Sequence, residues 1–180
     1  MRQFAIVLSL TLSTAALAAE LESRQLTHYV PQDFLETAVR KEGWTEVSLA
    51  VKGGVRKGDT VRVWAGGSID RGNGEQPGEN ANGPAGVDPA ALGPDRPALT
   101  LSPEPAHAYA LLFKTESTGP TKCLPPGQPL EIKLTKDLEK LWVGFNDEPG
   151  RYYDNHLGRG RRHELDPLWV RIEVVRTTVD

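Results

Sequence analysis

Apolar and polar residues alternate over several short stretches of the chain, which is the pattern of half-buried β-strands. The clearest stretch is 60–65, where Val61 and Val63 alternate with other residues. Similar stretches lie at 44–51, 107–115, 130–134, 141–145 and 169–175. Turn residues separate these stretches, and no series of helical patterns alternates with them. The sequence therefore predicts an all-β protein, an antiparallel β-sandwich.

One stretch near the N-terminus has helical spacing instead, so we expect a single α-helix at 31–41. Pro31 suits the first turn of a helix, and Gly43 follows its end. The apolar positions of the helix form one stripe: Phe34, Leu35, Ala38 and Val39. We expect this stripe to pack on the sheet, or the helix to cover the domain as a lid.

The first residues have the organisation of a signal peptide. Arg2 precedes an apolar run at 4–12, and Ala16-Leu17-Ala18 forms a small-residue cleavage site. We therefore expect a secreted or periplasmic protein. The expected organisation is a signal peptide at 1–18, an N-terminal extension with a short helix at 19–43, and the sandwich domain at 44–180. No apolar run is long enough for a membrane-spanning helix.

Composition narrows the functional classes. The formal net charge of −3 disfavours a nucleic-acid partner and is compatible with a cation site. Cys123 is the single cysteine, which excludes an internal disulfide and leaves either a buried thiol or a bridge between two chains.

Residues 66–98 are rich in Gly, Pro, Asn, Asp and Ala and predict a long loop region. Four tryptophans lie on strand patterns and are expected in the core: Trp44, Trp64, Trp142 and Trp169.

Candidate chemistry is concentrated in one short segment, residues 146–155, which follows a strand pattern. Side-chain oxygens lie at Asp147, Glu148, Asp154 and Asn155, on either side of a Pro-Gly turn. A calcium ion takes about 6–8 oxygen ligands, and a turn that folds Asp147 against Asp154 and Asn155 can supply part of that shell. The EF-hand spacing is absent. The same residues also suit an ordinary hairpin with an Asx turn.

The order of these motifs resembles the PA-I type galactophilic lectins, small bacterial β-sandwiches that bind galactose through a bound calcium. In that family an apolar strand runs into Asn-Asp-x-Pro-Gly-x-Tyr-x-Asn-Asn-x-Gly. Residues 141–155 are similar to this motif, with Asp154 in place of an Asn. Other segments follow the family order upstream: Gly58-Asp59, Gly83-Pro84-Ala85-Gly86 and Ala110-Leu111 with Lys114. The resemblance covers about residues 45–175 and implies a jelly roll of the galactose-binding-domain type.

The resemblance also implies a ligand set for Ca²⁺. Asp147, Asp154 and Asn155 would give side-chain oxygens, and Arg71 and Arg151 would give main-chain carbonyls. Sugar hydroxyls would complete the shell and would also donate hydrogen bonds to the carboxylates. The residues expected to contact the sugar are Asp147, Glu148, Arg151, Tyr153 and Asp154.

Three side chains of the segment have separate expectations. Tyr153 is expected to stack on a sugar face, and Tyr152 is expected to pack in the core. Glu148 either points to solvent or bonds a sugar hydroxyl. The lectins also carry a His and a Gln that contact the sugar after the Gly-Pro-x-Gly loop, but residues 87–93 contain neither. A preference for galactose therefore does not follow from the resemblance.

No enzymatic function is expected. Asp147 and Asp154 would hold the same cation, which makes them a poor acid–base pair, and neither a G-x-S-x-G nor an HExxH motif is present. The expected function is an exported, calcium-dependent, carbohydrate-binding module for a galactose-like sugar or another polyol, with a homo-oligomer as a compatible assembly. The alternative is a structural or interaction domain of the cell envelope, in which calcium orders loops and no sugar binds.

Overall fold

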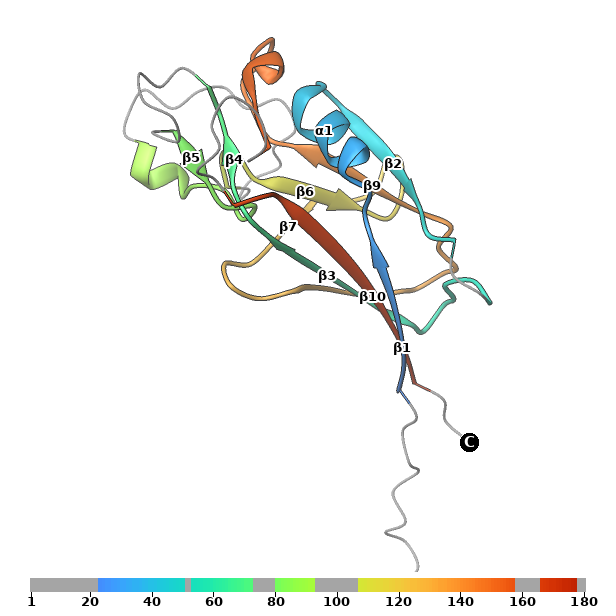
Figure 1. The fold of residues 1–180 in the computed structure, drawn as a ribbon. Helices are drawn as coiled ribbons and strands as arrows, with labels where there is room; N and C mark the ends of the chain where they lie inside the picture. The colour runs from blue at the N-terminus through green and yellow to red at the C-terminus, as the bar shows by residue number, and fades with distance from the viewer. Residues whose placement is uncertain (1–22, 51–52, 73–79, 93–106, 158–165, 178–180) are drawn as a thin grey trace, which may run out of the picture.

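Two four-stranded β-sheets dominate the computed structural model, which describes residues 23–50, 53–72, 80–92, 107–157 and 166–177 (Figure 1). The first sheet has the order β1 (Ser23–Tyr29), β10 (Trp169–Thr177), β3 (Thr60–Gly66) and β8 (Leu130–Lys133). The second sheet has the order β2 (Trp44–Ser48), β9 (Lys140–Phe145), β6 (Leu111–Lys114) and β7 (Lys122–Cys123). All strand pairs within the described ranges are antiparallel. The predicted antiparallel, mostly β class is therefore confirmed, and the two sheets are consistent with a sandwich.

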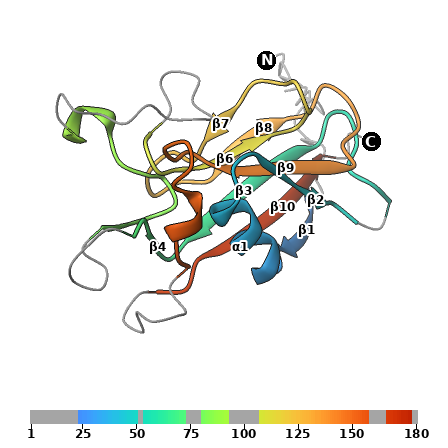
Figure 2. The ribbon, with the colours of Figure 1, turned by 90° about the horizontal axis from the view of Figure 1, so that it is seen from above.

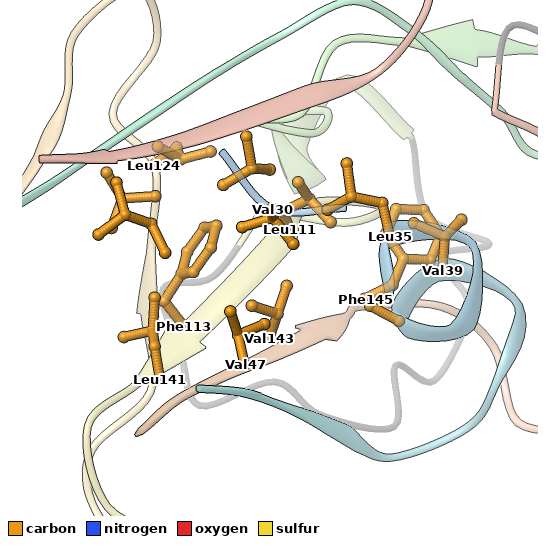
Figure 3. Close-up of a cluster of buried hydrophobic side chains, with 14 of the residues drawn as sticks. Val30, Leu35, Val39, Val47, Leu111, Phe113, Leu124, Leu141, Val143 and Phe145 are labelled. Atoms are coloured by element: carbon orange, nitrogen blue, oxygen red, sulfur yellow. The ribbon is translucent and has the colours of Figure 1, made fainter. Parts of the chain in front are cut away.

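A shared apolar core contains residues from both sheets. In β3, Val61 and Val63 are fully buried, while Arg62 between them is partly exposed, as the period of two requires. Phe113 of β6 and Phe145 of β9 are the largest fully buried side chains and lie in the same cluster as these valines (Figure 3). The alternation in the sequence therefore places one face of each strand in this core.

The helix α1 (Gln32–Arg40) lies within the predicted range and is confirmed. It buries Leu35, Ala38 and Val39, and Figure 3 shows Leu35 and Val39 beside Phe145. Phe34, predicted on the same stripe, is instead 38% exposed. The helix thus packs on the core instead of forming a separate lid, and it is the only α-helix in the described ranges. None of the described helices is long and apolar enough to cross a membrane.

The segment before Trp44 has more structure than an extension with one helix. Strand β1 was not predicted, yet its seven residues pair in unbroken register with β10, from Ser23 opposite Thr177 to Tyr29 opposite Arg171. Val30 and α1 then continue into the apolar core. The signal peptide predicted at 1–18 and the basic residues of 159–163 lie outside the described residues.

Two further expectations need correction. The strand predicted at 107–115 begins only at Leu111, because Tyr109 has the left-handed backbone angle φ of 55° and interrupts the extended chain. The tryptophans are not core residues: three are half-buried, and Trp169 is 42% exposed. They lie on the outward faces of their strands. Alternation alone does not tell which face of a strand points to the core, so it does not distinguish an outward tryptophan from a buried one.

The region predicted as a long loop carries short elements. A two-stranded sheet joins β4 (Ile69–Asp70) to β5 (Ala81–Asn82), and a 3₁₀ helix η2 covers Pro89–Leu92. A second 3₁₀ helix, η3 (Tyr152–Asp154), follows β9 and contacts α1. Figure 2 shows η3 between α1 and β4, so three segments distant in sequence meet at this end of the domain.

Candidate functional site

A main-chain bridge joins the end of β4 to the segment after η3. The Asp70 N–H donates to the carbonyl of His156 at 2.9 Å, and the His156 N–H donates to the carbonyl of Asp70 at 2.8 Å. Asp70 is fully buried, and its Oδ1 accepts the N–H of Gly72 at 3.1 Å. This bridge places residues 70–72 beside residues 154–156, as the predicted ligand set requires.

The approach of these two segments is close enough to require glycine at position 72. A Cβ built on Gly72 would lie 2.9 Å from the carbonyl oxygen of Asp154 and 3.0 Å from its Cγ. The φ of Gly72 is 71°, which side chains other than that of glycine rarely adopt. Gly72, which directly follows the predicted ligand Arg71, therefore lies against Asp154, another predicted ligand.

Asp147 and Asn155 form the buried floor of the site. Asn155 is fully buried and donates through Nδ2 to the Oδ2 of Asp147 at 2.7 Å and to the carbonyl of Val39 in α1 at 3.0 Å. Asp147 is 3% exposed, and its Oδ1 accepts the N–H of Glu148 at 2.7 Å. The predicted folding of Asp147 against Asn155 is thus present, and it is anchored to the helix.

The amide oxygen of Asn155 has no hydrogen-bond partner, although it is buried. Nearly all buried polar atoms in proteins are hydrogen bonded, and an unpaired one calls for an explanation such as a water or an ion. Amide oxygens are also suitable calcium ligands. This atom belongs to the residue that binds the Asp147 carboxylate, so an electron-rich group lies beside a buried acid.

The surroundings of Asp147 disfavour its ionised form. Burial is the main cause that raises the pKa of Asp147 above its ordinary value. The nearby charges of Asp154 and Glu148 raise this pKa further, while hydrogen bonds from Asn155 and from the Glu148 N–H oppose the shift. A bound cation would stabilise the ionised carboxylate against both burial and repulsion.

The remaining residues of the segment have mixed roles. The carbonyl of Arg151, a predicted ligand, accepts the N–H of Asp154 at 3.2 Å within η3. Tyr152 is 3% exposed and donates to the carbonyl of Phe145 at 3.0 Å, as expected for a packing residue. Tyr153, which is predicted to stack on a sugar, is 67% exposed.

Sequence reasoning missed Tyr109. Its hydroxyl donates to the Oε1 of Glu148 at 3.2 Å, so Glu148 has a protein partner instead of simply facing solvent. The centre of the Tyr109 ring lies 4.2 Å from the guanidinium carbon of Arg71. The main-chain carbonyl of Tyr109 accepts a hydrogen bond from the Nδ2 of Asn82 at 2.9 Å. The sequence pattern assigned Tyr109 to a strand, and nothing in it indicates the positive φ that turns this residue toward the site.

The segment Gly83-Pro84-Ala85-Gly86, singled out in the resemblance, lies close by. The carbonyl of Pro84 accepts the N–H of Leu111 at 2.9 Å, and the Gly86 N–H closes the turn onto Gly83 at 2.9 Å. This loop is therefore attached to the start of β6, two residues from Tyr109. Cys123, in β7, is half-buried beside Ala110 and Leu112.

The described residues contain no group of three or more His, Cys, Asp or Glu side chains placed to hold a metal ion by themselves. A cation here would depend on amide and main-chain oxygens in addition to carboxylates. Calcium accepts such mixed oxygen ligands, whereas zinc prefers His and Cys.

No protein-family model matches the chain, and no curated protein is significantly similar to it.

Proposed function

We propose that this protein is a calcium-dependent carbohydrate-binding module, with Ca²⁺ held at the 146–155 segment and sugar hydroxyls completing its coordination. The observation that carries this proposal is the unpaired, buried Oδ1 of Asn155 beside the Asp147 carboxylate. An oxygen-liganded cation would give this atom a partner, which the surrounding protein groups do not.

The residues present fit the ion. Asp147, Asp154 and Asn155 offer side-chain oxygens, and the backbone of Arg71 and Arg151 lies in the same two segments. When bound, Ca²⁺ would supply a positive centre that attracts vicinal hydroxyls. The carboxylates of Asp147 and Asp154 would accept hydrogen bonds from those hydroxyls, and the exposed Tyr153 ring offers a face for stacking.

The finer expectations belong to the same proposal. The two sheets would form a jelly roll of the galactose-binding-domain type, and the chain would be exported. Asp154 adds a carboxylate where the lectin motif has an amide, which should strengthen cation binding. The absent His and Gln favour a second candidate, in which the ion only orders the loops of an envelope or interaction domain.

A calcium titration tests the cation. Thermal unfolding of the wild type is compared in saturating CaCl₂ and in EGTA. A ligand at 100 times its Kd stabilises the folded state by about 2.7 kcal/mol, which for a domain of this size is a rise in Tm of about 5–10 °C. Asp147→Asn should abolish this rise, while Asp166→Asn, which neutralises an exposed acid, should retain it.

The sugar is tested separately. Galactose and a glycan array are applied with calcium and with EGTA. Calcium-dependent glycan binding supports the lectin-like module, and a calcium shift without glycan binding supports the structural alternative. If calcium leaves the Tm of the wild type unchanged, both metal-based functions are refuted.

A further inference from the structure

Arg71 is immobilised at the edge of the candidate site. Its Nε donates to the carbonyl of Asn80 at 2.7 Å, and its guanidinium carbon lies 4.2 Å from the centre of the Tyr109 ring. Asn80 in turn donates through Nδ2 to the carbonyl of Gly72 at 2.8 Å. The guanidinium is therefore fixed on one face and at one nitrogen before any ligand binds.

The two terminal nitrogens of this guanidinium have no hydrogen-bond or ion-pair partner among the described residues. Arg71 is half-buried, so part of its hydration is lost without a protein anion in return. By contrast, Arg176 directs its guanidinium at a carboxylate, with Nη2 2.7 Å from the Oδ2 of Asp59. The terminal edge of Arg71 is thus available to a ligand.

Contacts connect this edge to the proposed cation site from two sides. On one side, Tyr109 carries the guanidinium on its ring and bonds Glu148 through its hydroxyl, and the Glu148 N–H bonds Asp147. On the other side, Gly72 follows Arg71 directly and lies against Asp154. A ligand on the cation would therefore have a preorganised guanidinium within the same site.

We infer that the ligand is an acidic saccharide, whose hydroxyls face the calcium while its carboxylate is received by the terminal nitrogens of Arg71. This inference rests on the proposed function and deepens it. A guanidinium fork matches a carboxylate in shape and charge, and hydrogen bonds between two charged groups are stronger than those to a neutral hydroxyl. Because the Arg71 fork is already fixed by Asn80 and Tyr109, little side-chain entropy is lost on binding.

Arg71 would take over the selecting role that the His and Gln have in the lectins. Glu148 is held by the Tyr109 hydroxyl, which donates to its Oε1. Calcium and Arg71 together offset the negative charges of Asp147, Glu148 and Asp154.

The test is isothermal titration of the full chain with galacturonate and with galactose, both in saturating calcium. The wild type should bind galacturonate at least about tenfold more tightly, which is the usual effect of a hydrogen bond to a charged group. Arg71→Gln should remove this preference. Arg71→Lys keeps the charge but not the fork, and should retain part of the preference. Arg62→Gln makes the same charge change on β3, beside the exposed Glu131, and should behave as the wild type.

The outcomes separate this inference from the proposed function. Equal binding of both sugars by the wild type, or a preference that persists in Arg71→Gln, refutes the role of Arg71 and leaves the lectin-like module standing. Binding of neither sugar, with a normal calcium shift, refutes the acidic saccharide together with the sugar half of the proposed function. A wild type whose Tm does not rise with calcium refutes the proposed cation site itself.

Discussion

Replacing Asn155 by Ala tests the floor of the site without any ligand. The side chain is fully buried, and its amide makes two hydrogen bonds, one to the Asp147 carboxylate and one to the Val39 carbonyl. Alanine removes both donors. The buried Asp147 carboxylate and the Val39 carbonyl each lose one hydrogen bond, so the folded state should lose stability.

The size of the loss can be worked from the two bonds. A hydrogen bond to a neutral carbonyl contributes about 1 kcal/mol and one to a charged group about 2 kcal/mol, so Asn155→Ala should cost about 3 kcal/mol. For a domain of this size, that corresponds to a fall in Tm of about 6–12 °C.

The assay is urea unfolding at neutral pH in EGTA, followed by circular dichroism and analysed by linear extrapolation. Asn146→Ala is a matched control, because Asn146 is equally buried but donates only to the neutral carbonyl of His107 at 3.0 Å. The control should lose about 1 kcal/mol. If the two variants lose the same stability, the bond from Asn155 to Asp147 adds nothing, and the proposed floor of the site is wrong.

Three further predictions concern stability. Gly72→Ala should lower the free energy of unfolding by at least about 1 kcal/mol more than Gly127→Ala, because both glycines have φ near 70° but only Gly72 would place a Cβ against Asp154. Arg176→Met should cost about 3 kcal/mol at neutral pH, because it removes the charged partner of the buried Asp59. In EGTA, the free energy of unfolding of the wild type should fall as pH rises from about 4 through the raised pKa of Asp147. The reason is that the folded state binds the proton of the Asp147 carboxyl more tightly than the unfolded chain does. Asp147→Asn should not show this fall.

These predictions have their own controls. Arg62→Met breaks an ion pair with Glu131 whose partners are 38% and 53% exposed, and should cost less than about 1 kcal/mol. The hydrogen bonds of Arg176 are the main cause that lowers the pKa of Asp59, so the stability they give is present above pH 4 and is lost as pH falls toward the lowered pKa. A wild type and an Arg176→Met variant that converge at neutral pH and differ in acid would contradict this reasoning.

The sequence predicted the regular parts of the fold because they depend on local periodicity. Strand β3 and helix α1 carry an apolar pattern with an unambiguous period, and both lie where that pattern predicts. Strand β1 was missed because its sequence, from Ser23 to Tyr29, has few apolar residues, and its stability comes from pairing with β10. Pairing with a distant strand leaves little trace in a short window of sequence.

The candidate site also has parts that local sequence predicts and parts that it does not. The proximity of Asp147, Asp154 and Asn155 follows from a short turn, and it could be predicted from their spacing. The side-chain positions of Tyr109 and Arg71 could not, since they depend on a positive φ at Tyr109 and on a ring contact between residues 38 positions apart in sequence. Asn155 also bonds α1 across 116 positions, a contact that no local pattern encodes.

The strand order of the first sheet has a consequence for how the chain acquires its structure. Strand β10, the last strand described, lies between β1 and β3 and pairs with both. Until β10 is available, β1 has no neighbour and β3 has only β8 in its sheet. Folding must therefore wait for contacts between opposite ends of the described chain, and such non-local pairing is slow, on the order of milliseconds to seconds. A ribosome-bound fragment that ends before residue 169 should not form this sheet, whereas a chain that includes β10 should form it in one late, cooperative step.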